Sequence, residues 1–149
     1  MLTNKQYWRI WILAIVFVIV LALIDISTMN FWNLEITQDY AKVFWTFTFI
    51  AVALSCVTYY IFKRDKSEAV AIGVIFYGLI YSGLEDVLFF IIRDRALPAS
   101  MEHLLPHTTI GFLSRTFNME TVTPLFLIIT LIIGSFITYK VSKYLIRKM

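Results

Sequence analysis

Four apolar stretches, each about as long as a bilayer is thick, constrain this chain more than any other feature. They cover residues 8–26, 43–62, 69–92 and 124–141 of the 149-residue sequence. A helix of about 20 apolar residues crosses the roughly 30 Å of bilayer hydrocarbon. Because lipid offers the backbone no hydrogen-bond partner, such segments are expected to be helical. We therefore expect one all-α transmembrane domain over residues 1–149, a bundle of four membrane-spanning helices.

The composition excludes several classes of protein. Hydrophobic residues make up 60% of the chain and charged residues 15%, whereas soluble domains contain about 45–50% and about 25%. This argues against a soluble enzyme and a nucleic-acid-binding domain. The single cysteine, Cys56, lies in an apolar stretch. A single cysteine excludes an internal disulfide, and without a cysteine cluster a thiolate metal site is not expected.

The basic residues predict the orientation of the bundle, because Lys and Arg accumulate in cytosolic loops. Nine of them fall at the termini or in the loop after the second stretch: Lys5, Arg9, Lys63, Arg64, Lys66, Lys140, Lys143, Arg147 and Lys148. Four fall on the opposite side: Lys42, Arg93, Arg95 and Arg115. We expect a multi-pass protein of the cell membrane with both termini in the cytosol.

The loop before the last stretch, residues 93–123, is long for a four-span protein. Residues 97–105 mix apolar and polar positions after Pro98 and are followed by Pro106. We expect a short helix here that lies on the membrane and ends before Pro106, because proline cannot continue a helix. Pro124 is expected in the first turn of the last span, where proline is favoured.

The most informative residues are Glu85 and Asp86, two adjacent acids inside the third apolar stretch. A central acid in a span costs roughly 2.5–3.5 kcal/mol on an insertion scale. Glu85 is on the order of 10 Å from the outer end of that stretch at Ile92. We therefore expect both acids to face the bundle interior, a water-filled pocket or a basic partner. Burial and a like-charged neighbour favour a neutral carboxyl, so one of the two is expected to serve as a proton donor. The alternative is a structural pair bridged to Arg93, Arg95 or Arg115.

Helical spacing places the acids on two stripes of the third span. The stripes are Tyr77-Tyr81-Glu85-Phe89 and Gly78-Ser82-Asp86-Phe90, with members four residues apart on one helix face. Two small residues with this spacing let a neighbouring helix approach closely. We expect Gly78 and Ser82 to form such a contact, on the face that carries Asp86.

Two further features each allow more than one interpretation. Asp25, near the outer end of the first span, joins the acids if the first and third helices pack together; otherwise it marks a helix end in water. Glu102, His103 and His107 lie in the long loop, and could converge with Glu85 and Asp86 on a metal ion. Pro106 interrupts the His-x-x-x-His spacing that a metal-binding helix requires. The alternatives are solvated loop histidines and histidines that pair with the acids.

The segment Glu85-Asp86-Val87-Leu88-Phe89-Phe90 resembles the signature of the small integral-membrane lycopene cyclases of the heterodimeric type. That family has Pro-x-Glu-Glu or Pro-x-Glu-Asp in a transmembrane helix, followed by an aromatic pair. Gly83 stands here at the position of the proline. The resemblance covers about ten residues, and extends to Asp25 and Trp32 together with the small multispan layout.

The resemblance implies acid-initiated cyclisation or isomerisation of an isoprenoid, with Glu85 and Asp86 as acid and base in an unassigned order. Tyr77, Tyr81, Phe89, Phe90 and Trp32 would line the substrate site. The chemistry is redox-neutral and demands no cofactor, and the family's paired chains imply a homo- or hetero-oligomer. Two alternatives to this isoprenoid or lipid enzyme are a metal-dependent membrane hydrolase and a non-enzymatic subunit that binds lipid or a partner protein.

Overall fold

The computed structural model describes residues 4–32, 38–101 and 109–148, and the regular structure in these residues is entirely helical. This confirms the expected all-α class. The described residues form six helices, in chain order: α1 Asn4–Trp32, α2 Gln38–Lys63, α3 Lys66–Tyr81, α4 Leu84–Asp94, α5 Thr109–Thr116 and α6 Pro124–Lys148.

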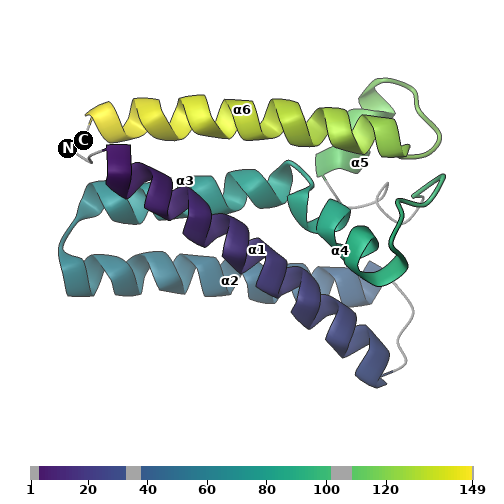
Figure 1. Ribbon diagram of the computed structural model, residues 1–149, viewed down its shortest axis with the longest axis horizontal. Helices are drawn as coiled ribbons and strands as arrows, with labels where there is room; N and C mark the ends of the chain where they lie inside the picture. The colour runs from purple at the N-terminus through teal and green to yellow at the C-terminus, as the bar shows by residue number, and fades with distance from the viewer. Residues whose placement is uncertain (1–3, 33–37, 102–108, 149) are drawn as a thin grey trace.

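The helices α2, α3 and α6 run side by side, with α3 in the middle (Figure 1). Helix α1 crosses α3 obliquely and continues along α4, which turns away from the axis of α3. The short helix α5 packs beside the start of α6. The start of α1, the end of α6 and the α2–α3 hairpin lie at the same end of the molecule, on the left in Figure 1.

Within the part of the chain that the structure describes, three helices are long and apolar enough to cross a membrane: α1, residues Val43–Lys63 of α2, and α6. The consecutive helices α3 and α4 together make a fourth candidate, but they are bent by 57° at the break between them. The expectation of helices long and apolar enough to span a membrane is therefore confirmed. The expectation of one continuous helix over residues 69–92 was wrong, because the chain breaks in the middle of that stretch.

The break has a local cause at Ser82 and Gly83. The Ser82 hydroxyl donates to the carbonyl of Leu79 (2.7 Å), and the Gly83 N–H donates to that of Ile80 (3.0 Å). Gly83 then takes a left-handed conformation with φ of 89°, which glycine adopts without steric cost. Left-handed glycines commonly end helices, so α3 stops here and α4 begins in a new direction.

Helices α3 and α6 approach closely through small residues. A Cβ atom built on Gly78 would lie 2.2 Å from the Thr138 hydroxyl oxygen, and one on Gly134 would lie 2.6 Å from the Ser82 Cβ. Both distances are far below van der Waals contact. The predicted close approach at Gly78 and Ser82 is confirmed. Because the helix breaks after Ser82, however, Asp86 does not continue the same straight stripe.

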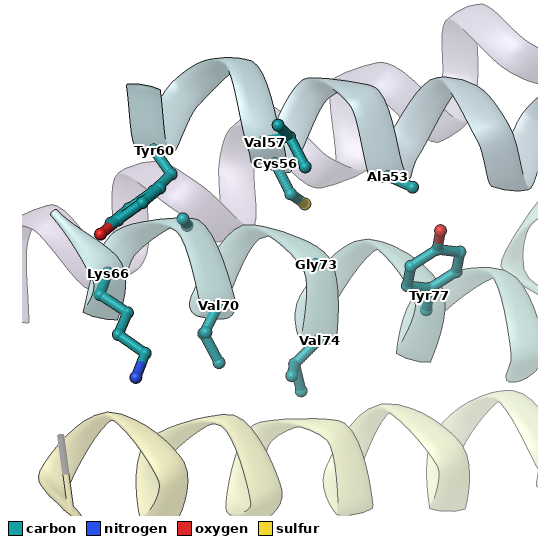
Figure 2. A pocket seen from close by; sticks show the side chains of 10 residues that line it. Ala53, Cys56, Val57, Tyr60, Lys66, Val70, Gly73, Val74 and Tyr77 are labelled. Carbon is teal, nitrogen blue, oxygen red and sulfur yellow. The ribbon is translucent and has the colours of Figure 1, made fainter. Parts of the chain in front are cut away.

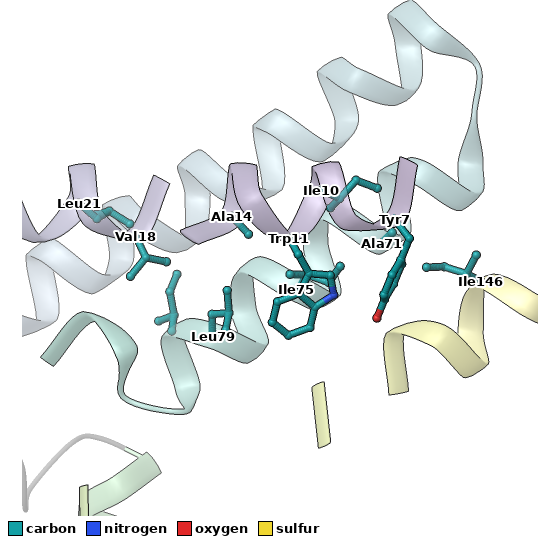
Figure 3. Close-up of a cluster of buried hydrophobic side chains, with 11 residues drawn as sticks. Tyr7, Ile10, Trp11, Ala14, Val18, Leu21, Ala71, Ile75, Leu79 and Ile146 are labelled. Carbon is teal, nitrogen blue, oxygen red and sulfur yellow. The ribbon is translucent and has the colours of Figure 1, made fainter. Parts of the chain in front are cut away.

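Two groups of buried apolar side chains stabilise the two ends of the bundle. The first joins α1, α3 and α6, with Ile75, Val18 and Ala14 fully buried and Trp11 packed between the helices (Figure 3). The second lies around α4 and the loops that precede α6, and includes Phe89, Phe90 and Leu127. The site described below lies between α1 and α4, toward this second group.

The long loop between α4 and α6 differs from the expectation in one respect. Residues 97–101, the first part of the expected helix over 97–105, are not helical, and its remainder lies outside the described residues. A short helix is present in the loop, but further along, as α5. The prediction that Pro124 opens the last span is confirmed, and the Thr123 hydroxyl caps that helix by accepting from the Phe126 N–H (3.3 Å).

Candidate functional site

Glu85 is the buried acid of this site. Its side chain is 3% exposed, and its Oε1 has no hydrogen-bond partner among the described residues. Buried polar atoms are nearly always hydrogen-bonded, and each exception needs an explanation. A buried carboxyl oxygen without a partner costs stability, so a role other than packing is a natural explanation for this residue.

Asp25 of α1 is brought to the same place by the packing of α1 against α4. It is half-buried, and it interacts electrostatically with Glu85 and with Asp86. The two arrangements left open for Asp25 are thereby resolved in favour of packing beside the acids. The structure thus brings the Asp25 carboxyl group beside the adjacent acids Glu85 and Asp86, which follow it by 60 residues or more in the sequence.

Tyr40, near the start of α2, completes the cluster. Its hydroxyl donates a hydrogen bond to Oδ1 of Asp25. Burial, together with this hydrogen bond, raises the pKa of the Tyr40 hydroxyl above its ordinary value, so the hydroxyl stays neutral and remains a donor. Tyr40 also interacts electrostatically with Glu85. We refer to Asp25, Glu85, Asp86 and Tyr40 as the acidic cluster.

The first turn of α4 positions two members of this cluster. Glu85 and Asp86 are both in that turn, because the break at Gly83 starts a new helix just before them. The first backbone N–H groups of a helix have no intrahelical acceptor, and the helix dipole favours negative charge there. The break therefore creates, inside a candidate span, a helix start where a carboxylate is better tolerated than in the middle of a continuous helix.

Arg93 does not form the ion pair that a purely structural role for the acids requires. Its guanidinium group bonds to Asp94 (Nη2 to Oδ2, 2.8 Å) and lies 4.7 Å from the centre of the Phe89 ring. Arg95 and Arg115 have exposed side chains. Arg93 does attract Asp25 electrostatically, so a positive charge lies near the cluster without bonding to Glu85.

The aromatic residues predicted for the substrate site are placed differently from one another. Phe89 and Phe90 follow the acids on α4 and are buried in the second apolar group. Tyr77 donates instead to the carbonyl of Phe49 on α2 (2.7 Å), and Tyr81 is 51% exposed and stacks on the Phe49 ring. Trp32, at the end of α1, is 67% exposed. Only Phe89 and Phe90 lie on the same short helix as the acids.

The metal-site alternative involved Glu102, His103 and His107 in addition to the two acids. These three residues lie outside the described residues. Within residues 4–32, 38–101 and 109–148, no group of three His, Cys, Asp or Glu side chains is arranged to hold a metal ion.

Tyr40 is the member of the cluster that sequence reasoning missed. In the sequence it is one of several aromatic residues near span ends, a position typical of membrane-interface tyrosines. Its proximity to Asp25 depends on how α2 returns beside α1. No spacing or motif in the sequence signals this.

A separate groove runs between α2 and α3 (Figure 2). It has a volume of about 890 Å³ and is lined by apolar side chains, with Lys66 at one end and Tyr77 at the other. No member of the acidic cluster lines it. The groove and the cluster are therefore two distinct features.

The acidic cluster combines groups that suit proton transfer. It contains a buried carboxyl group whose Oε1 has no partner among the described residues, a second carboxyl that accepts a hydrogen bond from Tyr40, and a third carboxyl adjacent in sequence to the first. Carboxyl groups in different environments can divide the roles of general acid and general base.

Comparison of the chain with protein-family models, curated proteins and solved structures finds no match.

Proposed function

We propose that this protein is a small integral membrane enzyme that acts on an isoprenoid or another lipid by carboxylate acid–base chemistry, through cyclisation or isomerisation of a double bond. The observation that carries the proposal is the buried, unpartnered carboxyl oxygen of Glu85, beside Asp25 and Asp86. Ionisable residues inside membrane spans are costly and mark functional sites by default.

The environments of the acids suggest their roles. A carboxyl group that is buried without a donor is best suited to hold a proton, whereas a carboxyl that accepts a hydrogen bond is better suited to the ionised form. Glu85 is then the general acid. Asp25, which accepts from Tyr40, is the general base, and Asp86 is the second candidate for that role.

The proposed reaction balances without a cofactor. The Glu85 proton adds to one carbon of a C=C bond, whose π electrons form the new C–H bond and leave a carbocation. In a cyclisation, a second double bond attacks this cation with its π electrons. The base then removes a proton from a neighbouring carbon, and the electrons of that C–H bond form the final double bond. One proton enters and one leaves, so the product is an isomer of the substrate.

The surroundings of the acids suit an apolar substrate and a cationic intermediate. The Phe89 and Phe90 rings lie on the same helix, within the second apolar group, and aromatic rings stabilise nearby cations through their π faces.

We further propose that the termini and the α2–α3 hairpin face the cytosol, as the distribution of Lys and Arg predicts. Association with a second chain, which the lycopene cyclase resemblance implies, is also part of the proposal.

The test is expression of the chain in bacterial membranes that contain a linear polyene isoprenoid, with incubation of isolated membranes and added unlabelled polyene in D₂O as a second arm. The wild-type chain should yield an isomer of the polyene with a different retention time. The isomer formed in D₂O should carry one non-exchangeable deuterium from the acid. Glu85→Gln should lower the yield by about 100-fold or more, the lower range for loss of general acid catalysis.

The matched control is Glu120→Gln, the same chemical change at an exposed acid in the loop before α6. It should leave the yield unchanged, and both variants should accumulate in membranes to wild-type levels. An unchanged yield from Glu85→Gln, or a product without solvent deuterium, contradicts the proposed role of Glu85. Absence of any isomer from the wild-type chain contradicts the isoprenoid assignment.

A further inference from the structure

The groove between α2 and α3 exists because small residues face each other across the two helices. A Cβ atom on Gly73 would lie 3.2 Å from the Cys56 Sγ, so the helices are close at this point and no side chain of Gly73 fills the space. Ala53 and Ala69 add further small positions to the lining. The result is an open, apolar hollow along the side of α3 (Figure 2).

The length of the groove matches one leaflet of a bilayer. Along α3 it extends from Lys66 to Tyr77, which is about 16 Å at about 1.5 Å per residue. The bilayer hydrocarbon is about 30 Å thick, so this distance is close to the depth that the acyl chains of one leaflet occupy. The groove therefore fits a lipid chain that enters from the end of the molecule at which the α2–α3 hairpin lies.

The mouth of the groove carries positive charge. Lys63, Arg64 and Lys66 are exposed at the hairpin. The two acids of this region are engaged inside the protein: Asp65 caps α3 by accepting from the Glu68 N–H (2.9 Å), and the Glu68 carboxylate accepts a hydrogen bond from the Tyr59 hydroxyl. The cations are thus left to face an external anion at the level of the lipid headgroups.

We propose that the α2–α3 groove binds one anionic phospholipid, with an acyl chain along α3 from Lys66 toward Tyr77 and the headgroup phosphate at Lys66. The hydrocarbon lining provides the fit for the chain, and the Lys66 ammonium provides the preference for negative charge. This site is independent of the proposed enzyme function, because no member of the acidic cluster takes part in it.

The test is native mass spectrometry of the purified full chain in a nonionic detergent, incubated with dioleoyl phosphatidylglycerol or dioleoyl phosphatidylcholine. The wild-type chain should retain one phosphatidylglycerol in preference to phosphatidylcholine. Lys66→Met should reduce this preference by about fivefold, the factor expected for one basic residue near an anionic headgroup. Lys66→Arg should keep it. Ala53→Trp, which fills the groove from α2, should lower retention of both lipids.

Lys5→Met is the matched control, because Lys5 is exposed on α1 and does not line the groove. It should leave the preference unchanged. Circular dichroism and gel filtration confirm that each variant is folded. Equal retention of the two lipids by the wild-type chain, or an equal loss in Lys5→Met, overturns the proposal. Lipid retention that is unchanged in Ala53→Trp also overturns the proposal. A wild-type dimer that dissociates on this substitution overturns it as well, because a second copy of the chain would then cover the groove.

Discussion

The two ends of this bundle solve the same packing problem in different ways. At the end near the termini, α1, α3 and α6 are uninterrupted helices, and their buried hydroxyl groups find partners: Tyr7 Oη lies 2.7 Å from Ser142 Oγ. At the other end, the third span breaks at Gly83 and places Glu85 in a buried position without a partner. At the first end, the neutral Trp11 Nε1 has no partner among the described residues, whereas the second end holds carboxyl groups between helices, at a larger cost.

This contrast resembles the relation between stability and function in many enzymes, where functional sites contain features that packing alone would not favour. The break at Gly83 is therefore the feature of the third span that positions the two acids. A continuous helix would place Glu85 and Asp86 in the middle of a helix, whereas the break places both in a first turn. Three substitutions test the contrast.

Gly78→Leu should cause the largest loss of stability. A Cβ atom at this position would lie 2.2 Å from the Thr138 hydroxyl oxygen, so α3 and α6 would have to separate. We expect the free energy of unfolding in detergent to fall by about 3 kcal/mol or more, at the upper end for overpacked cores. The control is Gly73→Ala, since the nearest atom there is the Cys56 Sγ at 3.2 Å. A loss for Gly78→Leu no larger than that of the control would show that this end is not closely packed.

Glu85→Met should change stability in the opposite direction. It removes a buried carboxyl oxygen that lacks a partner and fills the same space with an apolar side chain. The free energy of unfolding should rise by about 2 kcal/mol, within the range for burying an unpaired polar group. Conversion of the polyene should be lost at the same time. A fall in stability would instead mean that Glu85 holds this end together, which would remove the contrast between the two ends.

Gly83→Ala should cause the smallest change. Its φ of 89° disfavours a residue with a Cβ atom, at a cost of roughly 1–2 kcal/mol. The reduced entropy of the unfolded chain offsets about 0.4–1 kcal/mol of this. The nearest atoms are the ends of the Ile110 and Leu127 side chains, which can move. In thermal unfolding experiments we expect the free energy of unfolding to fall by about 1 kcal/mol. Gly83→Asn should lower it less, because asparagine tolerates a positive φ. Equal stability of all three proteins would mean that the left-handed turn is not required.

Much of the fold could be predicted because it depends on local composition. The apolar stretches locate the helices α1, α2 and α6, although α1 and α6 continue to Trp32 and Lys148, beyond the predicted ends at 26 and 141. The small residues Gly78 and Ser82 predict the close approach of α6. The break in the third span was missed, although Gly83 is visible in the sequence. An isolated glycine inside an apolar stretch is compatible with a straight helix and with a break, and the sequence does not decide between them. In the structure the break forms at Gly83, around which Ile110 and Leu127 pack.

The candidate site was predictable only in part, for a related reason. Glu85, Asp86 and Asp25 could be singled out because charge inside an apolar stretch is costly. The side chains around them could not be identified, because helical periodicity places residues on one face only while the helix continues. Because the helix breaks after Ser82, Tyr77 on α3 does not continue the helix face of Glu85; its hydroxyl donates to the Phe49 carbonyl of α2.

The sequence by itself determined that the chain forms apolar helices and that it carries acids inside them, because hydrophobicity and charge are properties of individual residues and act wherever the helix packs. Only the tertiary structure decided that the third span bends, that Tyr40 reaches Asp25, and that a groove opens between α2 and α3. The physical reason is that these features depend on contacts between residues distant in sequence, whose geometry follows from the packing of whole helices.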